Sequence, residues 1–214
     1  MPDYFPAHWL EIYIILSGII LLMLETFLKP KEKFYIGCLA IGALIFGLLF
    51  FFRIGPPVDN DEMARFYAWD SQAQFFKGFA MIATILAILL TLDYRKILAK
   101  FTADPDSEDS TGEYYCLMLF ACAGMMWMAS AKDLVSLFVS LELTTITFYI
   151  LVAYMRRNVG SLEAGVKFLI LGALSTGFLV YGISWIYGAT GTTDLATIAT
   201  MTEANPTYLL FGLS

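Results

Sequence analysis

One carboxylate, Glu142, stands near the middle of the apolar run "LVSLFVSLELTTITFYILVAY", which extends from Leu134 to Tyr154. A carboxylate at the centre of a membrane helix opposes insertion by about 2.5–3.5 kcal/mol, so such a residue normally has a partner or a task. It could make a static ion pair or hydrogen bond that fixes helix packing, or it could carry a proton or sense charge. The second interpretation is favoured, because acids inside membranes often mark ion paths.

A second charged residue, Lys167, lies inside a later apolar run. It follows Glu163 by four residues, so a local surface ion pair is one interpretation. At about 1.5 Å per residue from the nearest loop, Lys167 lies roughly 9 Å deep and Glu142 roughly 20 Å deep. If their helices pack together, the lysine stem and one water could bridge the gap. A lysine beside a carboxylate gains or loses its proton as neighbouring charges change, which a proton relay requires.

The composition places these residues in a bilayer. The 214 residues are 59% hydrophobic and only 15% charged, and the mean hydropathy is +0.71, which is too apolar for an ordinary soluble domain. Acids are concentrated in two loop-like segments, so the net charge of −6 implies no nucleic-acid partner. The three cysteines form no C-x-x-C motif, and we expect neither a metal site nor a cofactor site in the chain.

The apolar runs predict an all-α integral membrane protein, a polytopic helical bundle that forms a single membrane domain over residues 1–214. Runs long enough to cross about 30 Å of hydrocarbon number six, and the start of a seventh follows at about residue 206. The six predicted spans are His8–Leu28, Phe34–Phe52, Phe75–Leu92, Tyr114–Ala129, Leu134–Tyr154 and Ala164–Tyr187.

Basic residues predict that the N-terminus lies outside, because the inner loops of membrane proteins carry an excess of Lys and Arg. With this orientation eight basic residues fall in inner loops and three in outer loops, with Lys77 at a span edge. The inner set is Lys29, Lys31, Lys33, Arg95, Lys96, Lys100, Arg156 and Arg157, and the outer set is Arg53, Arg65 and Lys132. Near the inner end of the first span, Glu25 is expected to pair with Lys29 at i+4.

The fifth predicted span has polar residues on two faces. Glu142, Thr145 and Tyr149 share one face, and Ser136, Ser140, Thr144 and Thr147 fall on roughly the opposite one. Lipid cannot satisfy both faces, so we expect this helix to be buried among others, where hydroxyls can bond across the interfaces and an acid can meet a base or water. The short connection "SAKD" makes the fourth and fifth spans antiparallel neighbours, and Ser130 and Asp133 are spaced as a capping box.

The segment from Glu113 to Leu195, which includes "SLELTT" and "SLEAGVKFLILGALSTGFLVYGISWIYGATGTTDL", closely resembles the antiporter-like subunit N (subunit 2) of respiratory complex I. This complex is the proton-translocating NADH:quinone oxidoreductase. "WDSQAQFFKGF" in the third span is also similar to that subunit. The resemblance is dense from about Asp70 to Leu195 and weaker before it, and the chain resembles the N-terminal part of the subunit.

The resemblance implies a share in proton translocation coupled to quinone reduction. Glu142 matches the family's glutamate on the fifth helix, and Lys167 matches a basic residue on the sixth; both are assigned to the proton path. The implied partners are other membrane-arm subunits and the lipid bilayer, in an energy-transducing membrane such as the bacterial inner membrane. NADH, FMN, iron–sulfur clusters and quinone are expected in other subunits, with no redox site in this chain.

Two other functions remain open. The chain could belong to a secondary cation/proton antiporter assembly, which shares this ancestry but is driven by ion gradients. It could also be a purely structural piece of a membrane arm.

Overall fold

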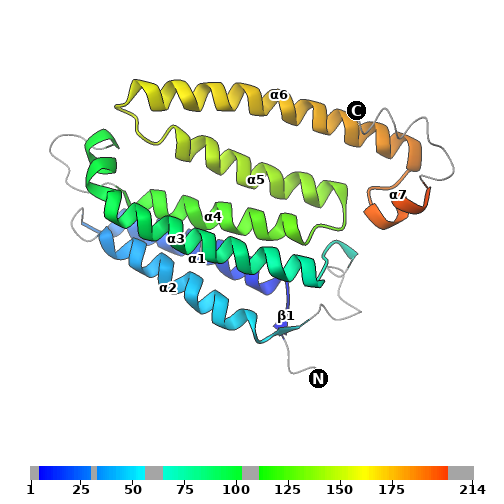
Figure 1. Cartoon of the computed structure of the whole chain (residues 1–214), viewed down its shortest axis with the longest axis horizontal. Helices are drawn as coiled ribbons and strands as arrows, with labels where there is room; N and C mark the ends of the chain where they lie inside the picture. The colour runs from blue at the N-terminus through cyan, green and yellow to red at the C-terminus, as the bar shows by residue number, and fades with distance from the viewer. Residues whose placement is uncertain (1–4, 30–32, 56–64, 103–110, 202–214) are drawn as a thin grey trace.

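A computed structural model describes residues 5–29, 33–55, 65–102 and 111–201. Within them the chain forms seven helices and two short parallel strands (Figure 1). The helices are α1 (Trp9–Phe27), α2 (Phe34–Phe51), α3 (Ser71–Thr102), α4 (Gly112–Ala129), α5 (Leu134–Val152), α6 (Val159–Thr190) and α7 (Leu195–Met201), and the strands are β1 (Phe5–Pro6) and β2 (Ile54–Gly55).

The all-α class is confirmed, since each of the six predicted spans contains a helix. The third and sixth helices are longer than predicted, with 32 residues each. Polar residues at their ends continue the helix, although the apolar run stops earlier. The short α7 was not predicted, and the predicted seventh span from residue 206 lies outside the described residues.

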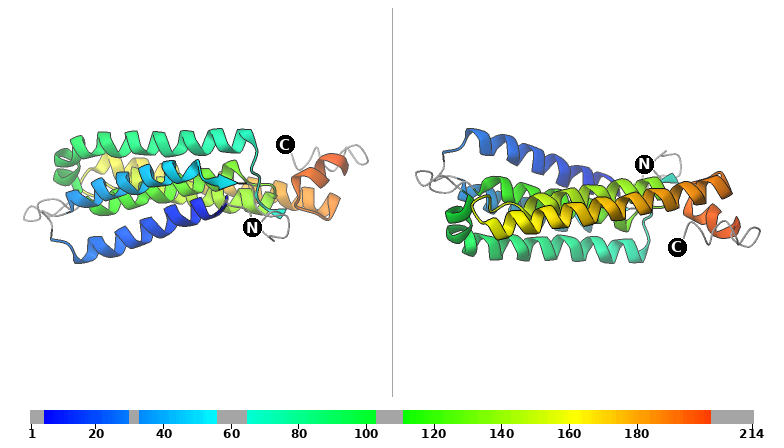
Figure 2. Two further views of the ribbon diagram at one scale, coloured as in Figure 1. Left: turned by 90° about the horizontal axis from the view of Figure 1, so that it is seen from below. Right: turned by 90° about the horizontal axis from the view of Figure 1, so that it is seen from above.

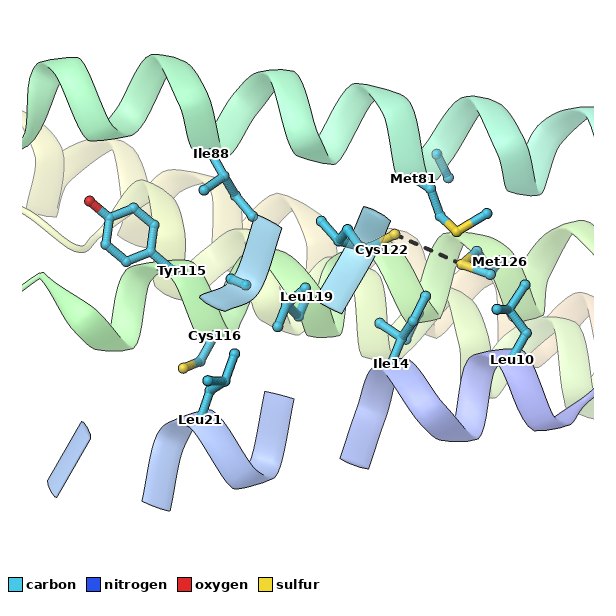
Figure 3. Close-up of a cluster of buried hydrophobic side chains, with 14 of the residues drawn as sticks. Leu10, Ile14, Leu21, Met81, Ile88, Tyr115, Cys116, Leu119, Cys122 and Met126 are labelled. Atoms are coloured by element: carbon cyan, nitrogen blue, oxygen red, sulfur yellow. Dashed lines mark hydrogen bonds between the residues drawn. The ribbon is translucent and has the colours of Figure 1, made fainter. Parts of the chain in front are cut away.

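Among the described residues, five helices are long and apolar enough to cross a membrane: α1, α2, α3, α5 and α6. The remaining predicted span, α4, has 18 residues and lies at the centre of the bundle. Figure 3 shows its Tyr115, Leu119 and Met126 packed among apolar side chains of α1 and α3, all fully buried. Because α4 faces protein on most sides, it needs fewer apolar residues directed at lipid.

The helices form layers (Figures 1 and 2). α6 packs on α5, α5 packs on α4, and α1, α2 and α3 surround the remaining sides of α4. The starts of α1, α3 and α5 lie at one end of the bundle, called here the N-terminal end, and the starts of α2, α4 and α6 lie at the opposite end. The helix that carries Glu142, α5, thus lies between α4 and α6.

Both polar faces of α5 meet protein, as predicted. Ser140, Thr144 and Thr147 are buried, and a Cβ on Gly124 of α4 would lie 2.4 Å from Thr144 Oγ1. On the other face, the Tyr149 hydroxyl lies against Gly172 of α6. The sequence allowed hydroxyl bonds across the interfaces, but Ser140, Thr144 and Thr147 donate to carbonyls of α5 itself. A hydroxyl that bonds its own helix leaves the interface free for close packing.

The start of α5 is capped by Asp133, not by the predicted Ser130–Asp133 capping box. Asp133 Oδ1 accepts from the backbone N–H of Val135 at 2.8 Å and of Ser136 at 3.4 Å. Ser130 instead terminates α4. Asp133 Oδ2 also accepts from Thr193 Oγ1 at 2.5 Å, so the start of α5 is fixed to the connection between α6 and α7.

Gly124→Ala tests the α4–α5 contact. The added methyl group would meet Thr144 Oγ1 and, at 3.1 Å, the backbone oxygen of Ser140, so the helices must separate, and overpacking of this kind costs about 1–3 kcal/mol. We expect less chain in the membrane and a lower unfolding midpoint in detergent. Gly42→Ala on α2 is the matched control, because nothing lies within 4 Å of its added Cβ; equal behaviour of the two variants would contradict the packing described.

Candidate functional site: charges inside the bundle

Glu142 is half-buried on the α6 side of α5. Its Oε1 accepts a hydrogen bond from Thr176 Oγ1 of α6 at 2.8 Å. Among the described residues no basic side chain forms an ion pair with it. Glu142 is therefore hydrogen-bonded to a neutral hydroxyl group.

Glu142 and Thr176 line a pocket of about 890 Å³ between α4, α5 and α6. Glu113 and Arg156 line the same pocket, and both belong to the opposite end of the bundle, where α4 begins and α5 ends. Glu142 lies ten residues before the end of α5, about 15 Å along the helix axis. Charged groups therefore occur at two levels of the pocket, one near a bundle end and one deep inside.

Lys167 does not contact Glu142. Its Nζ lies 2.5 Å from Glu163 Oε1, and the two side chains are 70% and 60% exposed. This is the local i,i+4 pair that the sequence allowed as one interpretation. The 32 residues of α6 span about 48 Å, more than the hydrocarbon core requires, so a lysine near its start can stay close to a membrane edge. The bridge from Lys167 to Glu142 is absent from the described contacts.

A buried charged cluster that the sequence analysis missed lies near the N-terminal end of the bundle. Glu11 of α1 and Lys77 of α3 form an ion pair, with Lys77 Nζ 2.8 Å from Glu11 Oε1 and both side chains 0% exposed. The Tyr67 hydroxyl donates to both carboxylate oxygens, at 2.9 and 3.1 Å, and accepts from Lys77. Glu11, Tyr67 and Lys77 are called the triad below.

The apolar surroundings of the triad keep Tyr67 protonated. Burial raises the pKa of the Tyr67 hydroxyl, and the adjacent charge of Glu11 raises it further. Lys77 Nζ also lies 4.1 Å from the centre of the Tyr67 ring and 4.8 Å from that of Trp69, within the range of cation–π attraction. The lysine, predicted at a span edge, is one of the largest fully buried side chains described.

A second buried acid, Glu25, pairs with Lys33 and not with the predicted Lys29. α1 ends at Phe27, so Lys29 lies beyond the helix and the i+4 geometry does not apply. Two of the acids in the bundle, Glu11 and Glu25, thus have a lysine partner from a different helix or its flanking turn. Glu142 has a threonine.

Comparison with known proteins gives two family matches. Residues 131–214 match the transmembrane family described as NADH:quinone oxidoreductase/Mrp antiporter, and residues 3–93 match the NfeD integral membrane domain. NADH-quinone oxidoreductase subunit N of Desulfitobacterium hafniense is 44% identical over 172 residues, which cover 79% of this chain and 32% of the relative. Its counterpart in Trichlorobacter lovleyi is 36% identical over 207 residues, which cover 95% of this chain and 40% of the relative. The chain resembles part of subunit N of NADH-quinone oxidoreductase.

The subunit N similarity also covers the segment that matches the NfeD domain, because the 207-residue alignment includes 95% of the chain. We therefore give the subunit N match more weight there. A further relative is F(420)H(2) dehydrogenase subunit N of Methanosarcina mazei, 34% identical over 198 residues, which cover 88% of the chain and 38% of the relative. The chain thus spans between about a third and two fifths of the length of these subunit N relatives.

The same fold occurs in a solved structure of respiratory complex I from Thermus thermophilus. The superposition has a TM-score of 0.66 and 24% identity, and it covers 95% of this chain and 43% of the other. The six long helices of this subunit N-like chain are therefore arranged as in a membrane protein of that complex.

Lys77→Met tests the buried ion pair. Removal of the ammonium group leaves the Glu11 carboxylate buried without its counter-charge, which typically costs about 3–5 kcal/mol. We expect the chain to accumulate poorly in membranes. Lys167→Met is the matched control, since exposed pairs contribute little, and its accumulation should stay near wild type. Similar accumulation of the two variants would mean that Lys77 is not buried as a charged partner.

Proposed function

We propose that the chain is the N-terminal part of the antiporter-like subunit N of a proton-translocating NADH:quinone oxidoreductase. In this proposal it contributes a transmembrane proton path coupled to quinone reduction, in an energy-transducing membrane of a bacterial cell. The observation that carries the proposal is the environment of Glu142, a half-buried acid that has a hydroxyl partner and lines a pocket between α5 and α6.

The comparison among the three acids supports this role. Glu11 and Glu25 have lysine partners within the described residues, so their charge is neutralised locally. Among the described residues the hydrogen-bond partner of Glu142 is Thr176, and a hydroxyl can donate to a carboxylate or accept from a carboxylic acid. A hydroxyl partner is therefore compatible with either form of the acid. This is what a group that takes up and releases a proton requires.

The pocket supplies one part of a route to Glu142. It reaches from Glu113 and Arg156 near the opposite end of the bundle to Glu142 and Thr176, and its volume exceeds many times that of one water, about 30 Å³. In this proposal protons enter from that end; because most side chains of the lining are apolar, water is expected only at its few polar groups, such as Glu113, Arg156 and Glu142. Lys167 lies on the same helix as Thr176, and its proposed role is to change the local charge near the entrance. Later helices of the subunit would supply the rest of the path.

The proposed topology has six membrane spans, α1 to α6, with the N-terminal end of the bundle outside. The described part of the opposite end carries Lys29, Lys33, Arg95, Lys96, Lys100, Arg156 and Arg157, whereas the N-terminal end carries Arg53, Arg65 and Lys132. The positive-inside rule supports this orientation. The pocket would then open toward the inner side, from which a respiratory pump takes its protons.

A second candidate function is that of a subunit in a cation/proton antiporter assembly. The description of the family that matches residues 131–214 names both NADH:quinone oxidoreductase and Mrp antiporter, and this favours the antiporter assembly as a second candidate.

The first proposal places NADH, FMN, iron–sulfur clusters and quinone in partner subunits of the membrane complex. A native complex that contains the chain should therefore absorb as a flavin and iron–sulfur protein, and an antiporter assembly should not. Because one relative is named F(420)H(2) dehydrogenase subunit N, the electron donor of the complex has to be measured separately.

Single cysteines test the orientation. Ser71 and Val159 are exposed first residues of helices that start at opposite ends of the bundle. In a Cys38→Ala background, we expect a membrane-impermeant thiol reagent to label Ser71→Cys from outside and Val159→Cys only after the inner side is opened. Cys116 and Cys122 are buried and serve as the internal blank. The reverse pattern would overturn the orientation and the direction of proton entry.

Glu142→Gln tests the proton path. Glutamine keeps the size and can still accept from Thr176, but it cannot release a proton. We expect the complex to assemble while proton uptake and coupled quinone reduction fall at least tenfold, with Glu142→Asp retaining more. Assembled complex, electron transfer and proton uptake are measured in the same membrane vesicles. Normal pumping would leave Glu142 as a packing residue, and loss of assembly would favour the static interpretation.

A further inference from the structure

The triad of Glu11, Tyr67 and Lys77 lies outside the pocket of Glu142 and has no part in the function proposed above. It joins three segments that are far apart in the sequence: α1, the segment before α3, and α3 itself. Tyr67 is the link among them, because its one hydroxyl bonds both charged partners. Its ring packs edge-on against Trp127 of α4, with ring centres 5.8 Å apart.

The backbone around Tyr67 connects the triad to the start of α5. The Ala68 N–H donates to Ser130 O at 2.7 Å, and the Lys132 N–H donates to Phe66 O at 3.1 Å. These two bonds hold residues 66–68 against the connection between α4 and α5. The α4–α5 connection is also bonded to the α6–α7 connection: the Leu134 N–H donates to Thr193 O at 2.9 Å, and the Leu195 N–H donates to Lys132 O at 3.0 Å. Residues 130–134 are therefore held between the segment of Tyr67 and the α6–α7 connection.

We propose that the triad is a charged positioning site, which sets the place of the α4–α5 connection and thereby of α5 with Glu142. The inference rests on the proton-carrying role of Glu142. The link is continuous: the ion pair fixes the Tyr67 hydroxyl, the Tyr67 segment fixes residues 130–132, and α5 begins two residues later. Its axis carries any shift at the start to Glu142, because a hydrogen-bonded helix moves as a unit.

A purely packing role would not require these residue types. A buried ion pair is often no more stabilising than apolar residues of the same volume, so its use points to orientation and specificity. Within the triad each charged group has a polar partner, and these bonds depend on direction. Leu10, Ile14 and Met81 belong to the buried apolar core of the same bundle. The polar contacts therefore define the position of Tyr67 more strictly than apolar contacts alone would.

Tyr67→Phe is the decisive variant, because it removes the hydroxyl and keeps the ring against Trp127 and the ion pair itself. The matched control is Tyr13→Phe, which removes a single hydroxyl bond from the same helix bundle, that from Tyr13 to Ala43 O at 3.1 Å. Both variants are made in the full subunit and examined in the assembled membrane complex. The measurements are complex yield, electron transfer, protons taken up per electron, and hydrogen exchange of the amides of Lys132 and Leu134.

We expect Tyr67→Phe to assemble in near wild-type yield, to lose at least half of its protons per electron, and to exchange the Lys132 amide at least tenfold faster. Tyr13→Phe should match wild type in all four measurements. An unchanged proton ratio with unchanged exchange would overturn the inference, and so would loss of assembly, which would assign the hydroxyl to folding alone.

Glu142→Gln in the same vesicles separates the two proposals. If Glu142→Gln fails to pump and Tyr67→Phe pumps normally, the triad has no positioning role and the proton path stands. If Glu142→Gln pumps normally, the proton path itself is wrong, whatever Tyr67→Phe does. The variant Lys77→Arg, which keeps the charge, should retain more coupling than Lys77→Met in whatever complex assembles; equal loss would also contradict a role for the charge.

Discussion

A charged group inside this bundle must find its partner in protein, because hydrocarbon offers none, and this requirement governs the arrangement of the helices. Glu11 meets Lys77 and Tyr67 between α1 and α3, and Glu25 meets Lys33 at the opposite end. The first pair fixes two helices that are distant in the sequence, and the second fixes the end of α1 to the start of the next helix, α2. Within the described part of the chain Glu142 bonds to Thr176, and this contact joins α5 to α6 through a neutral group.

The same requirement explains the position of α5. Ser140, Thr144 and Thr147 bond the backbone of their own helix, so the helix can pack closely against α4 at Gly124 and against α6 at Gly172. The cap at Asp133 and its bond to Thr193 fix the start of the helix. Glu142 thus lies on a helix that is held at its start and on two sides, beside a pocket that reaches the opposite end. A helix held in this way keeps Glu142 at a fixed place beside the pocket, which the proposed proton transfer requires.

Much of this could be predicted from the sequence, since the apolar runs gave helix ends within a few residues for α1, α2, α4 and α5. The ends of α3 and α6 were missed, because charged residues such as Arg95 and Lys96 stop a hydropathy signal and yet continue a helix. Glu11 and Lys77 are 66 residues apart, so no local spacing marks them as partners. The available signal was the depth of the two residues. Glu11 and Lys77 each lie less than two turns from the start of their apolar spans, and both starts lie at the same end of the bundle. The sequence allowed Lys167 either a bridge to Glu142 or a local pair with Glu163, and depth along a helix could not decide between them, because it does not say which way a side chain faces.

The central claim is that Glu142 changes its protonation state while the complex works. Infrared difference spectra of the assembled complex, taken between the resting state and turnover, measure this directly through the carbonyl stretch of a protonated carboxyl group. The account predicts a carboxyl band that appears or disappears with turnover in the wild type and is missing in the Glu142→Gln complex. Identical difference spectra for the two complexes, both fully assembled, would contradict it.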